Sequence, residues 1–349
     1  MKPMTFRSSP LYQITHLMNH LRKIVLALAL FYAAQLNAAE KALLNVSYDI
    51  TQEFYKEYDA AFIAHWKKVT PDEALTIRLS HGEASKQIRS VIDGLPADVV
   101  TMNGVTDLDQ LAKAQLIPAG WAKRLPNDSV PFTSTIVFVV RKGNPKEIKD
   151  WSDLVREGVS VITPNPKNSV NGRYSYLAAW IYALQRPGGN EAGARGFVKK
   201  LFSNVPALDN GGRAATMTFA QRGTGDVLLT FENEAAHLLT DLGPDAVEIV
   251  VPSVSILVEN PVAWVDPVVK KNGSETEAKA YLEYLFGPEG QEIAARHDLR
   301  PIDPKTLTKY PGRFPDIPLS SVSKVFGGWE NAQKIHFADG GTFDQIYQK

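Results

Sequence analysis

Apolar positions along the chain alternate between short continuous runs and longer stretches with a period of about four residues. Leu43–Val46 is a continuous run typical of a buried strand, and an aromatic residue recurs every fourth position in the stretch 51–69 that follows. On a helix this spacing forms one apolar stripe, made of Phe54, Tyr58, Phe62 and Trp66. Strand-like runs at 74–79 and 98–102 flank a second helical pattern that stops at Gly94. This order predicts a βαβαβ unit with a parallel sheet.

The second half of the chain repeats this alternation after a long β-forming run at 133–141, which we expect to cross between two lobes. Further strands are predicted at 159–162, 226–230, 247–251 and 262–265, the last two carrying the return crossing. Further helices are predicted at about 169–185, 213–221, from about 231, and at 274–286, 288–296 and 329–337. The pattern therefore predicts a second α/β lobe.

The first 39 residues have the composition of a secretory signal peptide. Basic residues precede an apolar run at Ile24–Leu36, small residues follow at 37–39, and the first acidic residue is Glu40. The run of about 13 residues is shorter than the roughly 20 that cross a membrane, and the alternatives are a signal anchor or an N-terminal core helix. The chain has no cysteine, so no lipid-modified cysteine can follow the leader. We expect a protein that is free in the periplasm.

The mature chain is long enough for two lobes, because 310 residues exceed what one compact core usually carries. We predict lobe 1 at 40–133, lobe 2 at 134–255, and a return to lobe 1 with C-terminal helices at 256–349. The leader holds four basic and no acidic residues, so 38 basic and 38 acidic residues become 34 and 38, a formal charge of −4. That balance argues against nucleic-acid binding. An anion would have to be bound by local geometry.

Four loops share one design, in which small or polar residues open a helix. They lie at 47–49, 82–85, 169–172 and 210–213. A helix start leaves backbone N–H groups unpaired at the positive end of the helix dipole, which favours an anion. In an open α/β sheet such loops meet at the carboxyl ends of the strands. They predict an anion site between the lobes, with ordinary N-caps as the alternative.

Several longer motifs resemble the periplasmic sulfate- and thiosulfate-binding proteins of ABC importers. The motifs are LLNVSYD (43–49), LPADVVT (95–101), FTSTIVFVVRKGNPKEIKDWSDLV (132–155), ITPNPK (162–167), RYSYLAAW (173–180), FENEA (231–235) and FGGWENAQKIHFADGGTFDQI (326–346). The resemblance implies a two-lobed type II binding protein, each lobe a mostly parallel sheet flanked by helices, with a hinge between them. It implies a monomeric receptor that serves an ABC permease, with no cofactor and no enzymatic activity.

The resemblance also implies which residues hold the anion. In that family the ligand is bound by backbone N–H groups at helix starts and by one serine hydroxyl, without a cationic partner. Matching motifs give backbone donors, a hydroxyl donor and one ring at the site: Asp49, Ala84, Ser169, Val170, Asn171, Gly212 and Phe231. Ser169 is the hydroxyl donor among these. Arg173 matches an arginine beside the site that supports the loop.

Three positions depart from the family pattern. Phe231 stands where the sulfate branch has a tryptophan indole donor, and it resembles the thiosulfate branch, whose ligand carries a softer terminal sulfur. Glu83 places a carboxylate beside the expected anion, and Val170 replaces a glycine. These departures leave another oxyanion, such as an organosulfonate, as an alternative ligand.

Other functional classes find little support in the sequence. The histidines outside the leader are not spaced as metal ligands, so no metal site is predicted. No nucleophile motif or P-loop occurs, which leaves an exported sulfate or phosphate ester hydrolase as a weak alternative. Glu232 and Glu234 lie at a predicted helix start, where carboxylates suit the helix dipole.

Overall fold

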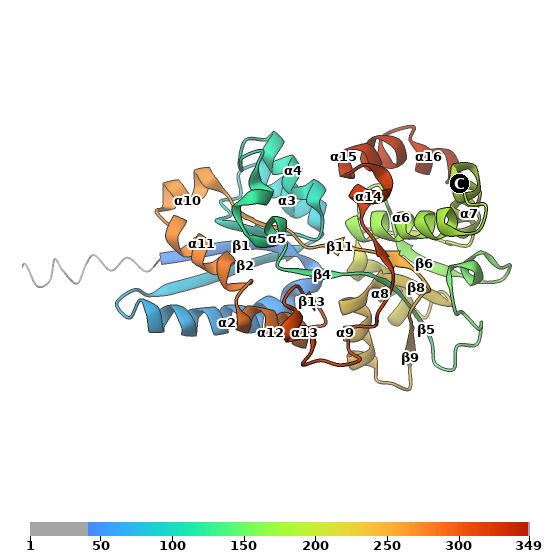
Figure 1. Ribbon diagram of the computed structural model, residues 1–349, viewed down its shortest axis with the longest axis horizontal. Coiled ribbons are helices and arrows are strands. Elements are labelled where there is room, and N and C mark those ends of the chain that lie inside the picture. The colour runs from blue at the N-terminus through green and yellow to red at the C-terminus, as the bar shows by residue number, and fades with distance from the viewer. Residues whose placement is uncertain (1–40, 348–349) are drawn as a thin grey trace, which may run out of the picture.

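The protein consists of two lobes joined by crossing strands, as a computed structural model of residues 41–347 shows (Figure 1). Lobe 1 is built around a four-stranded sheet and lobe 2 around a five-stranded sheet. Helices flank the sheets in each lobe (Figure 1). The predicted signal peptide, 1–39, lies outside the described residues.

The sheet of lobe 1 is mostly parallel and has the order β2-β1-β3-β12. Its central strand β1 (Lys41–Tyr48) pairs in parallel with β2 (Leu75–Gly82) and β3 (Val99–Thr101). The edge strand β12 (Val262–Trp264) runs antiparallel to β3. The helices of this lobe are α2 (Gln52–Val69), α3 (Ala84–Ile92), α4 (Val105–Lys113), α10 (Asp266–Asn272), α11 (Glu275–Tyr284), α12 (Pro288–Arg296) and α13 (Pro304–Leu307), with short turns η2 (Trp121–Arg124) and α5 (Pro126–Ser129).

The aromatic stripe of α2 packs into the core of lobe 1, as its spacing predicts. Phe54, Tyr58 and Phe62 are almost fully buried. The rings of Tyr58 and Phe62 lie 5.1 and 5.2 Å from that of Tyr281 in α11, both edge to face. Burial of each such side chain contributes about 1.5–3 kcal/mol, and this packing fixes α2 and the loop that precedes it.

The sheet of lobe 2 has the order β7-β6-β8-β5-β9 and mixes both directions. β6 (Val161–Pro164) pairs in parallel with β7 (Leu208–Asp209) and β8 (Val227–Phe231). β5 (Ile136–Arg141) runs antiparallel to β8 and to β9 (Val247–Val250). The helices of this lobe are α6 (Val170–Gln185), α7 (Glu191–Ser203), α8 (Gly212–Ala220) and α9 (Glu232–Leu242), with a short turn η3 (Trp151–Val155).

The crossing between lobes differs from the single run predicted at 133–141. That run is divided into β4 (Phe132–Ser134) and β5, because Thr135 leaves the strand pairing and its hydroxyl donates to the carbonyl of Ile256 at 2.9 Å. β4 pairs with β11 (Val258–Glu259) and β13 (Arg300–Pro301) in a three-stranded antiparallel sheet between the lobes. The return crossing therefore runs through β11; β9 belongs to lobe 2 and β12 to lobe 1.

The C-terminal part of 256–349 contributes to lobe 2 as well as lobe 1. β14 (Leu319–Ser320) pairs with β10 (Ser255–Ile256), and the last helices lie beside α6 and α7 (Figure 1). These helices are α14 (Val322–Phe326), α15 (Trp329–Ala332), a π turn (Gln333–Phe337) and α16 (Thr342–Ile346). The Phe343 ring lies 5.2 Å from that of Phe202 in α7, edge to face. Aromatic packing thus attaches the tail to lobe 2.

Candidate functional site

Helix starts from both lobes meet at the cleft between them. η1 (Asp49–Thr51) follows β1, and α3 follows β2 in lobe 1, while α6 and α8 follow β6 and β7 in lobe 2. A Cβ atom at Gly211, just before α8, would lie 3.3 Å from Cγ of Glu83 and 3.8 Å from Oδ2 of Asp49. One at Gly212 would lie 3.1 Å from Nδ2 of Asn171. The four predicted loops are therefore brought together at the carboxyl ends of parallel strands, where ligands bind in such sheets.

Ser169 caps the first turn of α6. Its Oγ accepts a hydrogen bond from the backbone N–H of Gly172 at 3.4 Å, and the residue is only 2 % exposed. A hydroxyl that accepts from its own helix keeps its proton available to another acceptor. The cap is compatible with a role of Ser169 as a hydroxyl donor, which stays a prediction.

Val170 and Asn171, the first two residues of α6, are buried at 1 % and 2 % exposure. A Cβ atom at Gly104, the N-cap of α4 in lobe 1, would lie 3.0 Å from Cγ1 of Val170. The valine therefore fits because the facing residue of the other lobe has no side chain. The Asn171 amide donates to Oγ1 of Thr230 at 3.3 Å, which holds the start of α6 against β8.

Phe231 ends β8 and precedes α9, and it is 1 % exposed. Its ring centroid lies 6.1 Å from that of Tyr174 in α6, edge to face. The side chain is therefore buried against α6 and brings no hydrogen-bond donor to this strand end.

Arg173 is 7 % exposed and supports the loop before α6. Its Nε donates to the carbonyl of Pro166 at 3.1 Å, and its Nη2 to that of Lys167 at 3.3 Å. Burial lowers the pKa of the Arg173 guanidinium, although the nearby Asp107 and Glu83 carboxyls oppose that shift. Two of its donors thus hold the loop before α6, and its role beside the anion stays a prediction.

Glu83 points toward the start of its own helix. One carboxylate oxygen accepts from the N–H of Ser85 at 2.9 Å and the other from the N–H of Lys86 at 3.1 Å. The sequence shows that Glu83 departs from the family pattern. It does not show where the side chain points, which is set by these two capping hydrogen bonds. Two of the free N–H groups at the start of α3, where Ala84 is predicted to donate, are therefore already used.

Charged residues surround Asp49, a proximity that the sequence did not predict. Glu234 in α9 is fully buried, and Nη1 of Arg213 in α8 lies 3.8 Å from its Oε1. Burial, then repulsion by Glu234, raises the pKa of the Asp49 carboxyl to about 6, although Arg213 opposes the shift. Burial likewise raises the pKa of Asp107 to about 7. The separation of these residues in sequence gives no signal that they share a cleft.

We expect the Asp49 carboxyl to make a contribution to the stability of the ligand-free protein that decreases as the pH rises from about 4 to 6. Its carboxyl pKa is about 6 when folded and an ordinary 3.8 when unfolded, so the folded state takes up a proton first as the pH falls. Above pH 7 the ionised Asp49 carboxylate lowers the free energy of unfolding by up to about 3 kcal/mol. This loss of stability is relieved as the carboxylate is protonated between about pH 6 and pH 4. Urea denaturation across this range should show that Asp49→Asn loses this part of the pH dependence.

A control for this experiment is Asp93→Asn, which changes an exposed carboxylate at the end of α3. Its pH profile should follow that of the unchanged protein. A profile for Asp49→Asn that also follows the unchanged protein would contradict the assignment to Asp49.

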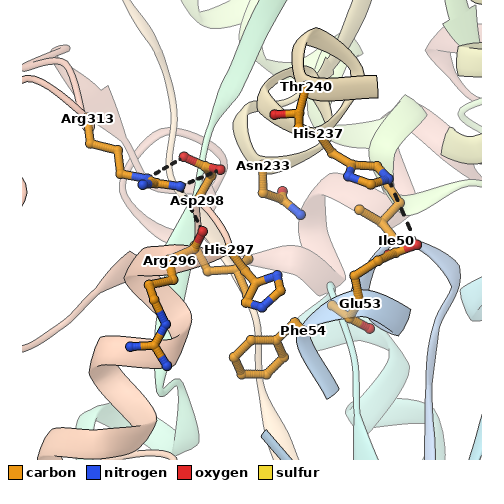
Figure 2. Close-up of a pocket in the computed structure, with 12 residues that line it drawn as sticks. Ile50, Glu53, Phe54, Asn233, His237, Thr240, Arg296, His297, Asp298 and Arg313 are labelled. Carbon is orange, nitrogen blue, oxygen red and sulfur yellow. Dashed lines mark hydrogen bonds and ion pairs between the residues drawn. The ribbon is translucent and has the colours of Figure 1, made fainter. Parts of the chain in front are cut away.

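A second concavity, of about 360 Å³, lies between α2, α9 and the end of α12 (Figure 2). Each basic side chain that lines it faces a carboxylate. The Arg313 guanidinium donates to Asp298 at 2.7 Å, and Nε2 of His237 lies 3.9 Å from Oε1 of Glu53 (Figure 2). Arg296 and His297 both contact Glu57. These pairings make it a weaker candidate for an anion than the helix starts.

Two kinds of feature are not found within residues 41–347. No group of three or more His, Asp or Glu side chains in this range is placed to hold a metal ion. In the same range, none of the helices is both long and apolar enough to cross a membrane.

The fold and the cleft define a solute receptor, and comparison with known proteins agrees. Residues 44–300 match the family described as bacterial extracellular solute-binding protein, and the chain belongs to that family. The predicted two-lobed α/β fold is thereby confirmed.

The particular relatives are sulfur oxyanion-binding proteins. The chain is 58% identical to the thiosulfate-binding protein of Pseudomonas aeruginosa, over 88% of this chain and 93% of that protein. It is 54% identical to the sulfate-binding protein of Salmonella typhimurium, over 89% of this chain and 94% of that protein. The solved sulfate-binding protein of Mycobacterium tuberculosis H37Rv superposes with a TM-score of 0.75 at 30% identity, covering 84% of this chain and 98% of that one. The predicted resemblance is confirmed.

Proposed function

We propose that this protein is the periplasmic receptor of an ABC importer for a tetrahedral sulfur oxyanion, sulfate or thiosulfate. The observation that carries the proposal is the meeting of helix starts from both lobes around Ser169 and Gly212. The relatives named for binding thiosulfate and sulfate support the same ligand class. Those names describe binding and not catalysis, so we assign no enzymatic step.

The proposed binding mechanism uses dipoles and neutral donors. The backbone N–H groups of Asp49, Ala84, Val170, Asn171 and Gly212 would donate to the anion, together with the Ser169 hydroxyl. Unpaired N–H groups at helix starts carry partial positive charge and already point along the helix axis, so they need little reorganisation. Hydrogen bonds to a charged acceptor are roughly twice as strong as neutral ones. Such a site suits a mature chain of formal charge −4.

Closure of the lobes would bury the bound anion. Ser85 in lobe 1 donates through Oγ to the carbonyl of Asn168 in lobe 2 at 3.0 Å. Arg213 in lobe 2 lies 3.6 Å from Glu53 in lobe 1. These contacts cross the cleft, and the three-stranded sheet through β4 is the natural hinge. The closed lobes would present one joined surface to the membrane permease, which fits a monomeric receptor in the periplasm.

The function is tested by competition among sulfate, thiosulfate and methanesulfonate for the purified mature protein. The readout is the thermal shift that each anion produces. A ligand at 100 times its Kd should stabilise the protein by about 2.7 kcal/mol. We expect sulfate or thiosulfate to raise the melting temperature. If none of the three anions stabilises the protein, the result contradicts the proposed function.

Phe231 is proposed to favour thiosulfate over sulfate. Thiosulfate's terminal sulfur is a weaker hydrogen-bond acceptor than oxygen, so an apolar ring beside it costs less affinity. Phe231→Trp adds an indole N–H and should change the affinity ratio toward sulfate by about tenfold, since a hydrogen bond to a charged group contributes about 1.5–3 kcal/mol. Titration calorimetry with both anions measures the ratio.

The matched control is Phe231→Leu, which stays apolar and adds no donor. Its sulfate-to-thiosulfate ratio should remain near that of the unchanged protein. An unchanged ratio in Phe231→Trp would remove residue 231 from the selectivity of the site.

A further inference from the structure

The carboxylate of Glu83 lies where the cleft narrows. Its two oxygens accept from the N–H groups of Ser85 and Lys86, as a capping residue does. Across the cleft, a Cβ atom at Gly211 would lie only 3.3 Å from its Cγ. The side chain is therefore enclosed between the start of α3 in lobe 1 and the start of α8 in lobe 2.

Glu83 also lines an open cavity that both lobes share. The cavity measures about 530 Å³ and is lined by Lys86 and Arg89 of α3 as well as by Asn168 and Asn210 of lobe 2. The Glu83 charge acts on the interior as well, because it raises the pKa of both Asp49 and Asp107. One carboxylate thus adds negative potential to the proposed anion site, while Lys86 and Arg89 add positive charge to the open cavity beside it.

We propose that Glu83 is a charge filter, which reduces the advantage of doubly charged over singly charged sulfur oxyanions and so extends the ligand range to small sulfonates. This inference rests on the proposed function, because it concerns the selectivity of the same site. Glu83 acts in two ways: it uses two N–H donors of α3, and it repels an incoming anion in proportion to that anion's charge.

The repulsion between Glu83 and the ligand changes the affinities of two anions in a fixed ratio. That ratio does not depend on the distance between Glu83 and the ligand or on the local dielectric. Coulomb energy is proportional to the ligand charge. Sulfate carries two negative charges and methanesulfonate carries one, while both are small and tetrahedral. Removing the Glu83 charge should therefore change the logarithm of the sulfate affinity by twice as much as that of methanesulfonate.

Glu83→Gln tests the filter, since it removes the charge and keeps the side-chain size. We expect titration calorimetry to show a gain of about tenfold for sulfate and about threefold for methanesulfonate. Equal gains for the two ligands, or an unchanged sulfate affinity, would overturn the filter.

A matched control is available at the start of α13. Asp303 accepts from the N–H groups of Lys305 and Thr306 at 3.2 and 3.1 Å, in the same capping arrangement. Asp303→Asn therefore removes a capping charge outside the cleft, and it should leave both affinities unchanged. A gain in Asp303→Asn equal to that in Glu83→Gln would show that a general loss of negative charge is responsible, which overturns a local filter.

The outcomes separate this inference from the proposed function. If the unchanged protein binds sulfate and Glu83→Gln binds both ligands with unchanged affinity, the filter fails and the function stands. If neither protein binds any of these anions, the function fails and the filter with it. Should Glu83→Gln unfold, Glu83→Ser supplies a neutral capping side chain and must show the same twofold relation between the logarithmic gains.

Discussion

Replacing Ser169 with alanine should weaken the binding of sulfate or thiosulfate by about 1.5–3 kcal/mol, or roughly 10- to 150-fold. The hydroxyl is 2 % exposed and accepts from the N–H of Gly172, which leaves its proton for the ligand. A buried charged acceptor that loses a donor keeps the full cost of its desolvation. Titration calorimetry with the anion that the unchanged protein prefers measures the loss.

The same substitution removes an N-cap, so a control must separate capping from binding. Ser321 caps α14 through a hydrogen bond from the N–H of Lys324 at 3.2 Å. Ser321→Ala should therefore lower stability by about 1 kcal/mol and leave anion affinity unchanged. An unchanged affinity in Ser169→Ala would contradict the hydroxyl assignment.

Replacing Glu232 with alanine should lower the free energy of unfolding by about 3–5 kcal/mol. Its carboxylate accepts from Nε and Nη2 of Arg300 at 2.6 and 2.8 Å, and the two side chains are 9 % and 14 % exposed. Arg300 lies in β13 of the hinge sheet and Glu232 opens α9 in lobe 2. Removal of the carboxylate leaves a guanidinium buried without its partner. Urea denaturation monitored by tryptophan fluorescence measures the change.

An exposed ion pair provides the comparison. Glu275 and Lys279 in α11 contact at 2.7 Å with side-chain exposures of 55% and 40%. Glu275→Ala should cost at most about 0.5 kcal/mol. If Glu232→Ala loses as little stability as that, the ion pair between Glu232 and Arg300 contributes little to the free energy of unfolding.

The sequence predicts most clearly the parts of the fold that depend on local periodicity. The stripe from Phe54 to Trp66 predicts α2 within one residue at its start. Among the described residues, seven helices carry no prediction: α4, α5, α7, α10, α13, α14 and α16. Two of them, α14 and α16, have only five residues each. Such short helices depend on packing against the rest of the lobe more than on their own pattern.

Candidate site residues were predictable where a loop has a recognisable design, and less so where the partner comes from another lobe. The starts of α3, α6 and α8 all occur at predicted loops. The ion pair between Glu232 and Arg300 was not predictable, because Arg300 lies on a strand that is distant in sequence. The sequence predicted only that Glu232 interacts with the helix dipole. The fit of Val170 against Gly104 was not predictable either, because it depends on how close the lobes come. The direction of the Glu83 side chain is set instead by hydrogen bonds within the first turn of α3.

The contact between Val170 and Gly104 makes the residues tolerated at two distant positions depend on each other. A side chain at 104 would meet the valine methyl groups at 3.0 and 3.2 Å, and overpacking of this kind costs about 1–3 kcal/mol. Position 104 can therefore accept a larger residue only if position 170 becomes smaller. The effect of a substitution at either position thus depends on the residue at the other.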